Sequence, residues 1–279
     1  MGYHNMLGEP GSISASRTGL RRTASANGLF QGLVADTKSF NTKPCDPREV
    51  CCPILPSRAF VKPCHKMTSI ILYYSPGACS LASHVLLKEI DVNFEAVRVE
   101  MKASLPESFR KINPKMRVPV LSIDKNVITE TPAIFTAISQ LAPERNLLGR
   151  SNTEIVRTYE WLNWLSGTLH GQAFGGLVRP HRYADDPALY DAIKAKGWKN
   201  AEECFEKIES DLSGVHAVGD SFTAVDVFLY VFYRWGSFSG AQMAHRYPKY
   251  SELVVNLAQR SSVQEVLQAE GVPSFLPKL

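Results

Sequence analysis

Residues 70–80 read IILYYSPGACS, and this stretch decides the fold. An apolar, β-branched run ends at Pro76-Gly77, and Cys79 precedes a segment of helical composition that starts at Leu81. The expected order is a strand, a tight turn, a thiol and a helix start. Free N–H groups and the positive end of the helix dipole favour an anion there, so we expect the Cys79 thiolate to be stabilised and reactive. The alternative is a buried, inert cysteine, the more common fate of a lone thiol.

Charge is distributed unevenly along the 279-residue chain, which has a net charge of +4. Residues 1–66 hold nine Lys or Arg and four Asp or Glu, whereas the remaining 213 residues hold 22 basic and 23 acidic ones. The basicity therefore belongs to the first segment, and the remainder lacks the electrostatic footprint of a nucleic-acid-binding protein. Because no run of about 18 apolar residues occurs, we expect no membrane span.

Residues 1–66 differ in composition from the rest of the chain. They are rich in Ser, Gly, Thr, Asn and Pro and lack helical or strand periodicity, so we expect a disordered extension. Arg17, Arg21 and Arg22 among serines and threonines resemble an organelle transit peptide. The alternatives are an unstructured extension or an upstream start that is not normally used, since Met67 directly precedes the first expected strand.

The six cysteines are divided between the two segments, with four in the extension and only Cys79 and Cys204 in the remainder. Two thiols far apart in sequence form no disulfide framework, which favours a reducing compartment and a cytoplasmic protein. The cysteines of the extension include no Cys-x2-Cys pair, so we expect no metal site.

After Met67, alternating and periodic segments predict an α/β domain. The expected elements are a strand, a helix, a strand, a short helix, a two-stranded hairpin and a closing helix, at 69–74, 81–90, 94–99, 107–111, 118–123, 127–129 and from Thr131. A βαβ unit followed by a hairpin predicts a mixed four-stranded sheet with helices packed on it.

Beyond a linker at 142–149, only helical periods follow. The expected helices are at 153–171, 188–213, from Thr223, at 249–260 and near Gln264. Thr223 and Asp226 have the spacing of a capping box, which predicts that they stabilise a helix start without a chemical role.

Pro119 lies near the start of a strand that should be central, where a missing N–H is costly. The proline is tolerable there if the Val118-Pro119 bond is cis and turns the Val118 backbone outward. The exposed N–H and C=O of Val118 could then pair with an extended, peptide-like ligand. The alternative is an edge strand with an ordinary trans proline.

One face of the helix expected at 153–171 is polar or small. Asn163, Gly167 and His170 are spaced i, i+4, i+7 and so share a face, which meets either solvent or a wet cleft. The alternative for His170 is a solvated or structurally satisfied histidine.

Six spaced motifs carry a resemblance to a known family. They are residues 73–81, 112–115, 118–121, 129–134, 161–165 and 222–226. In this order they resemble the cytosolic glutathione S-transferases, and most closely the bacterial beta-type class. The resemblance implies homodimers and a thioredoxin-like, glutathione-binding domain at 67–145. It also implies an all-helical domain at 151–279 that binds an electrophile.

The resemblance also implies roles for individual residues. Val118, before the cis Pro119, would pair with the backbone of glutathione's cysteine, while Glu130 and Thr131 would hold the γ-glutamyl group. Further ligand contacts are implied for Lys102, which would meet the glycine carboxylate, and for Arg117 and Asn163.

The catalytic group implied by the family comprises Cys79, Ser80 and His170, which would lie at the glutathione sulfur. Gly171 departs from the family, which often has a lysine at that position, and part of the thiolate-stabilising charge is therefore missing there.

We therefore expect a glutathione transferase that detoxifies small apolar electrophiles, since Phe174, Leu177 and Tyr183 are candidates for lining an apolar cleft. The glutathione thiolate would be the nucleophile. One alternative is a glutathione-dependent thiol-disulfide oxidoreductase or peroxidase that uses Cys79. Another is a non-catalytic module of the same fold that serves dimerisation.

Overall fold

The computed structural model describes residues 68–101 and 105–274. The expectations for the extension at 1–66 and for Lys102 fall outside these residues. Within the described ranges, no helix is long and apolar enough to cross a membrane.

Four short strands form the sheet predicted for the first half. They are β1 (Ile70–Tyr74), β2 (Glu95–Arg98), β3 (Val120–Ile123) and β4 (Asn126–Thr129). Their order is β2-β1-β3-β4, with β2 parallel to β1 and the other two pairs antiparallel. A β1–helix–β2 crossover followed by the β3–β4 hairpin gives this mixed sheet, as in thioredoxin-like domains.

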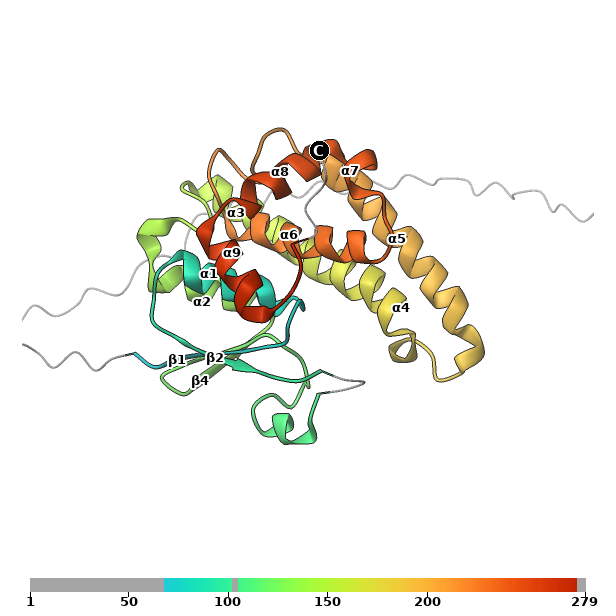
Figure 1. The fold of residues 1–279 in the computed structure, drawn as a ribbon, viewed down its shortest axis with the longest axis horizontal. Helices are drawn as coiled ribbons and strands as arrows, with labels where there is room; N and C mark the ends of the chain where they lie inside the picture. Colours follow the sequence, from blue (N-terminus) through green and yellow to red (C-terminus); the bar gives the residue numbers. More distant parts are fainter. Residues whose placement is uncertain (1–67, 102–104, 275–279) are drawn as a thin grey trace, which may run out of the picture. The chain divides into compact units, whose positions relative to one another are not determined.

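Side chains alternate between the two faces of this sheet, as a pleated strand requires. Helices α1 (Ser80–Glu89) and α2 (Thr131–Leu141) pack on one face, where Leu72 and Leu121 join the main core (Figure 1). Tyr73 and Val120 instead join a second, smaller cluster with Phe109 of the 3-10 helix η1 (Glu107–Lys111). The two central strands, β1 and β3, therefore have apolar side chains on both faces of the sheet.

The Val118-Pro119 bond is cis, as predicted, and the expectation of a trans proline is wrong. Val118 lies two residues before β3 and outside the register that pairs β3 with β1. Its backbone is therefore not used by the sheet.

The second half is helical throughout. Its α-helices are α3 (Asn152–Trp164), α4 (Gly175–Val178), α5 (Tyr190–Asp211), α6 (Ala224–Phe238), α7 (Met243–Arg246), α8 (Pro248–Ala258) and α9 (Ser261–Glu270). The four-residue α7 was not predicted, because one turn is too short to show a period. The described chain also contains four 3-10 turns, which are η1 in the first half and η2 (Pro143–Arg145), η4 (Pro180–Arg182) and η5 (Pro187–Leu189) after it.

The single α-helix expected at 153–171 is wrong in its second part. The segment η3 (Leu165–Phe174) is a π-helix, so its backbone bonds run from residue i to i+5. This wider turn changes the angular spacing of side chains after Trp164. The spacing of Asn163, Gly167 and His170 therefore no longer places them on one α-helical face.

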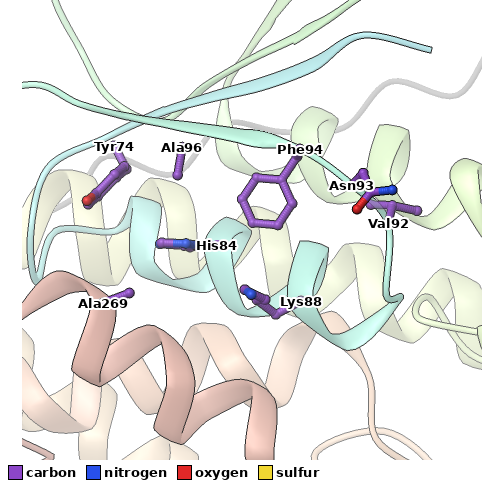
Figure 2. Close-up of a pocket in the computed structure, with 8 residues that line it drawn as sticks. All are labelled: Tyr74, His84, Lys88, Val92, Asn93, Phe94, Ala96 and Ala269. Carbon is purple, nitrogen blue, oxygen red and sulfur yellow. The ribbon is translucent and has the colours of Figure 1, made fainter. Parts of the chain in front are cut away.

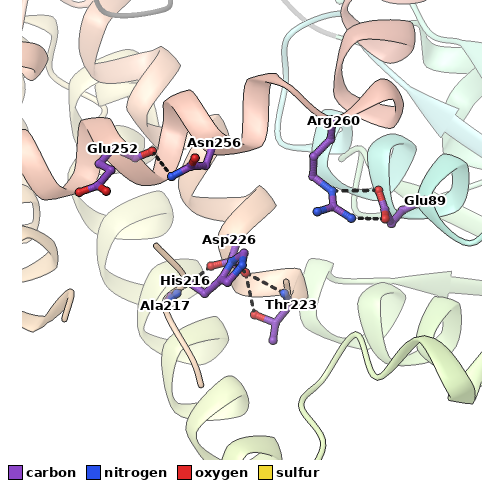
Figure 3. Close-up of polar contacts among 8 residues, drawn as sticks. All are labelled: Glu89, His216, Ala217, Thr223, Asp226, Glu252, Asn256 and Arg260. Carbon is purple, nitrogen blue, oxygen red and sulfur yellow. Dashed lines mark hydrogen bonds and ion pairs between the residues drawn. The ribbon is translucent and has the colours of Figure 1, made fainter. Parts of the chain in front are cut away.

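The predicted cap of α6 is confirmed. Asp226 is fully buried and accepts hydrogen bonds from Thr223 N at 2.7 Å and Ala217 N at 2.7 Å, and His216 Nδ1 lies 3.3 Å away (Figure 3). The bond from Thr223 N belongs to the capping box, and the bond from Ala217 N holds the preceding loop. Asp226 therefore holds the loop before α6, which is the structural role expected of it.

A single hydrophobic core runs through both halves, and α1 packs against both α6 and α9. At its far end, α1 is joined to the segment before α9 by an ion pair between Glu89 and Arg260 (Figure 3). Ser262 Oγ donates to the same carboxylate at 2.6 Å. Burial opposes ionisation of Glu89, but the hydrogen bonds from Arg260 and Ser262 outweigh it and lower the pKa of this carboxyl.

Candidate active site

The turn between β1 and α1 brings Cys79 to the cis-proline. Cys79 is the N-cap residue of α1, and its side chain is buried, with 6% of its surface exposed. Its Sγ–H donates to the backbone oxygen of Val118 at 3.3 Å, across 39 residues of sequence. Two predicted site residues are therefore in direct contact.

The expected stabilisation of the Cys79 thiolate is wrong. Burial raises the pKa of Cys79 to about 11. Arg179, the backbone N–H groups of Cys79 and Ser80, and Arg117 all act in the opposite direction, but together they do not offset the loss of water. The helix-start effect is therefore present and outweighed, and at neutral pH Cys79 is a thiol that can donate a hydrogen bond.

Ser80 is fully buried, and its hydroxyl is used inside the turn. Ser75 N donates to Ser80 Oγ at 3.1 Å, and Ser80 Oγ donates to Ser75 O at 3.2 Å. This hydroxyl holds the turn rather than a ligand's sulfur, which corrects the catalytic role predicted for it. The backbone N–H of Ser80 at the helix start remains the group that faces the site.

The same turn is held from the helical half, by residues that the sequence did not reveal. Gly77 N donates to Glu270 Oε2 of α9 at 2.8 Å, and Trp235 Nε1 of α6 donates to Gly77 O at 3.0 Å. The other oxygen of Glu270 lies 2.9 Å from His84 Nδ1 of α1, and both side chains are buried. Both polar groups of the Gly77 peptide are thus fixed from segments more than 150 residues away.

His170 lies in η3, beside the ring of Trp235, with 5.2 Å between ring centroids. Since Trp235 also bonds to Gly77, it links His170 to the turn that carries Cys79. Burial, together with the charges of Arg179, Arg117 and Arg182, lowers the pKa of His170 to about 4. His170 is therefore neutral at physiological pH.

Asn163 is exposed on α3, ahead of the π-helical segment. Within the described part of the chain, no hydrogen bond joins it to Cys79 or His170. The structure thus brings His170 to the site and leaves Asn163 without a contact there.

Glu130 and Thr131 stand at the start of α2, where Glu130 is exposed and Thr131 is buried at 7% exposure. Glu130 is exposed and has a φ of 72°, a conformation that is costly for any residue other than glycine and is concentrated at functional sites. Its carboxylate forms an ion pair with Lys115 Nζ at 2.6 Å. Thr131 is the first residue of the helix, and no side chain caps the N–H groups there. This start is free to accept a carboxylate.

Arg117, Arg179 and Arg182 carry the positive charge of the site. Arg117 and Arg179 act on Cys79, and all three act on His170, which also feels the charge of Glu130. Arg117 was predicted from the sequence, but Arg179 and Arg182 were not. They follow a helix and flank Pro180, and no sequence signal tells which way side chains in such a segment point.

The expected cleft residues divide between core and surface. Phe174 is buried against the rings of Phe232 and Trp235, so its proposed role in an open cleft is wrong. Leu177 is half-buried against the main core. Tyr183 is 50% exposed, and its hydroxyl donates to the backbone oxygen of Gly171 in η3.

A pocket of about 310 Å³ lies elsewhere, between β2, α1 and α9 (Figure 2). Phe94 and Ala96 line it from the β2 side, His84 and Lys88 from α1, and Ala269 from α9. None of the predicted site residues lines it, so the candidate site is distinct from this pocket. In the ranges that the structure describes, no cluster of His, Cys, Asp or Glu could hold a metal ion.

Comparison with known proteins agrees with this architecture. A model of the glutathione S-transferase N-terminal domain matches residues 68–140. The chain is 33% identical over 208 residues to the glutathione S-transferase GstA of Escherichia coli O157:H7, which covers 72% of this chain and 98% of that protein.

Solved structures give the same result. A glutathione transferase homologue from Sulfitobacter, solved with bound glutathione, matches with a TM-score of 0.69 and 27% identity over 74% of this chain and 99% of its own. A bacterial beta-class enzyme from Sphingomonas chungbukensis matches with a TM-score of 0.64 and 31% identity over 73% of this chain and 100% of its own. The chain belongs to the glutathione S-transferase family and is similar to its bacterial members.

Proposed function

We propose that this chain is a transferase that activates the thiol of glutathione and conjugates it to an electrophile. The N-terminal part, residues 67–145, would hold the tripeptide, and residues 151–279 would hold the electrophile. One observation supports the proposal: Cys79 Sγ–H donates to Val118 O, and Cys79 and His170, from separate segments, both feel the charges of Arg117 and Arg179. Glu130 also acts on His170.

The tripeptide backbone would lie along Val118, whose N–H has no partner among the described residues and whose C=O meets only the Cys79 thiol. The γ-glutamyl carboxylate would accept hydrogen bonds from the Thr131 hydroxyl and from the open start of α2. Its ammonium group would replace Lys115 at Glu130. That exchange is cheap, because the side chains of Lys115 and Glu130 are 52% and 58% exposed and such surface pairs contribute little.

The nucleophile would be the thiolate of glutathione. Cys79 would donate a hydrogen bond to it, the start of α1 and the neighbouring arginines would stabilise its charge, and neutral His170 would add a donor without a proton transfer. The thiol proton leaves to solvent, the sulfur bonds to the electrophilic carbon, and the leaving group departs with its electron pair. Holding both reactants together lowers the barrier further.

A redox function of Cys79 is disfavoured by the same geometry. Thiol-disulfide exchange needs a thiolate, and the pKa of about 11 leaves almost none at neutral pH. We further propose that the protein works as a cytoplasmic homodimer in detoxification, which is consistent with the free thiols of Cys79 and Cys204.

The test is calorimetric titration of the full chain with reduced glutathione, together with a conjugation assay using 1-chloro-2,4-dinitrobenzene. We expect binding and turnover. Thr131→Val should weaken glutathione about ten-fold, the effect of one charge-assisted hydrogen bond, whereas Thr131→Ser should bind like the wild type. Thr153→Val, at an exposed threonine of α3, is the control. Glutathione binding without turnover of any electrophile would favour the non-catalytic module, and no binding would refute the proposal.

A further inference from the structure

We propose that Arg179 and Arg182, together with Arg117, form an anion subsite for the second substrate, so that the preferred electrophile is an apolar or aromatic molecule that carries a carboxylate or sulfonate. This proposal rests on the transferase function proposed above, and it adds the chemical class of the electrophile. The geometry, the charge balance and the position of these side chains each support it.

Arg117 is tied to the Cys79 end of the site. It directly precedes Val118, whose oxygen accepts the Cys79 thiol at 3.3 Å. Asn113 Nδ2 donates to Arg117 O at 2.7 Å and fixes the backbone there, while the side chain is exposed. Arg117 therefore presents its charge from the sheet side.

Arg179 and Arg182 approach from the helical half. Arg179 Nη2 donates to Met101 Sδ at 3.4 Å, so this side chain reaches the segment that follows β2. Tyr183, next to Arg182, donates its hydroxyl to Gly171 O and thereby folds residues 179–183 back over η3, where His170 lies. The segment is thus fastened at both ends beside the proposed reaction site.

A glycine of α4 makes this fold-back possible. A Cβ at Gly175 would collide with the Tyr183 hydroxyl, which donates to the backbone oxygen of Gly171. The absence of a side chain at Gly175 therefore lets residues 179–183 lie against η3.

The three guanidinium groups lack acidic partners. No ion pair involving Arg117, Arg179 or Arg182 is formed among residues 68–101 and 105–274, and Glu130, whose charge acts on His170, is paired with Lys115. Burial and the charges of Arg179 and Arg117 lower the pKa of Arg182, which reports like charges held close together. A bound anion would relieve this repulsion.

The electrophile, rather than glutathione alone, is the expected occupant. The start of α2 can take the γ-glutamyl carboxylate, and Arg117 can serve glutathione from the sheet side. Arg179 and Arg182 belong to the half assigned to the electrophile, and the exposed ring of Tyr183 beside them offers an apolar surface. An aromatic acid combines both features. If the arginines instead serve only the glutathione thiolate, their removal would slow the conjugation of a neutral electrophile as much as that of an anionic one.

The test compares 4-chloro-3,5-dinitrobenzoate with its methyl ester, which differ in charge at the same ring. In both, glutathione sulfur bonds to the ring carbon and chloride leaves with the electron pair. Each enzymatic kcat/KM is divided by the uncatalysed rate with glutathione, which removes the electronic difference. We expect the acid to be favoured. Arg182→Gln should raise the KM of the acid about ten-fold and that of the ester less than about two-fold, as expected for one charge-assisted contact.

Arg182→Lys should keep most of the preference because it keeps the charge, and Arg157→Gln on α3 is the matched control, since that arginine pairs with Glu160 at 2.6 Å outside the site. The proposal is overturned if the ester is used as well as the acid, or if Arg182→Gln slows both equally through kcat. If wild-type protein binds glutathione and conjugates only the ester, the transferase function stands and the anion subsite fails. If neither is conjugated, the anion subsite fails, and the transferase function fails with it only when 1-chloro-2,4-dinitrobenzene is not conjugated either.

Discussion

The two helices that pack on the sheet begin in opposite ways. At the start of α1, Cys79 is almost fully buried, and both polar groups of the Gly77 peptide are held by the helical half. At the start of α2, Glu130 is exposed and strained, and its carboxylate forms an ion pair with Lys115. Both starts have a positive dipole end, and both Cys79 and Thr131 are buried there, at 6% and 7% exposure. They differ in what precedes the helix, because the turn before α1 is held by the helical half, whereas the exposed Glu130 precedes α2.

This difference shows that a helix start alone does not define an anion site. Burial at α1 outweighs the dipole and raises the pKa of Cys79, so that start positions a neutral thiol. At α2 no side chain in the described ranges caps the helix start, which leaves the N–H of Thr131 for a ligand carboxylate. The first start would orient glutathione's sulfur, and the second would anchor its far end.

The largest effect is expected when the side-chain contacts that hold the turn before α1 are removed. Glu270→Ala leaves Gly77 N–H and His84 Nδ1 buried without a partner, and we expect a loss of about 3 kcal/mol or more in the free energy of unfolding. Urea denaturation of the full chain measures it. Glu265→Ala, on the same helix but exposed and paired only with Lys88, should cost less than about 0.5 kcal/mol. Equal losses in the two variants would show that the buried contacts of Glu270 contribute no more to stability than an exposed ion pair does.

The next effect concerns the reactivity of the fastened cysteine. With a pKa of about 11 against the ordinary thiol value of 9.0, the Cys79 thiolate is about 100-fold scarcer at pH 8 than that of an unperturbed thiol, and alkylation should slow by about that factor. Peptide-resolved mass spectrometry after iodoacetamide treatment, in native buffer and in urea, measures the ratio. The native rate should rise steadily up to about pH 11. A plateau near pH 7 would mean that the helix start does stabilise the thiolate.

Features of this contrast that depend on residues close together in the sequence could be predicted, and features that depend on residues far apart in the sequence could not. The strand-turn-helix order, the cis bond before Pro119 and the Thr223–Asp226 cap follow from neighbouring residues, and all were predicted. The burial of Cys79 depends on packing in the folded chain, and the local sequence pattern does not predict it. Glu270 meets Gly77 across 193 residues, and nothing near either one signals the contact.

The helical half shows a second limit. The apolar positions of residues 165–174 suit an α-helix and a π-helix equally over so short a segment, so the change of helix type after Trp164 was missed. The arginines at positions 179 and 182 lie beside a proline in an irregular segment. Their direction depends on the Tyr183–Gly171 bond, which only the folded chain reveals.

The far end of α1 gives a prediction on pH. Because its hydrogen bonds lower the pKa of Glu89, this carboxylate contributes stability that is full above its unfolded pKa, near 4.5, and is lost as the pH falls below it. Glu89→Gln should cost about 1–2 kcal/mol at pH 7. It should also show a smaller further loss than the wild type between pH 5 and about pH 3. Urea titrations at several pH values test this, and parallel losses in both proteins would contradict the assignment.

The smallest expected effect lies at the open start. Lys115→Gln removes the ion pair that Glu130 forms within the described residues, and because both side chains are about half exposed the free energy of unfolding should fall by less than about 0.5 kcal/mol. The freed carboxylate no longer has to exchange a lysine for the γ-glutamyl ammonium, so calorimetry should show glutathione binding about two-fold more tightly, within the range of one exposed pair. Lys125→Gln, in the exposed β3–β4 turn, is the control. Weaker binding in Lys115→Gln would mean that Lys115 itself contacts the ligand, and that the start of α2 is more tightly organised than its exposure indicates.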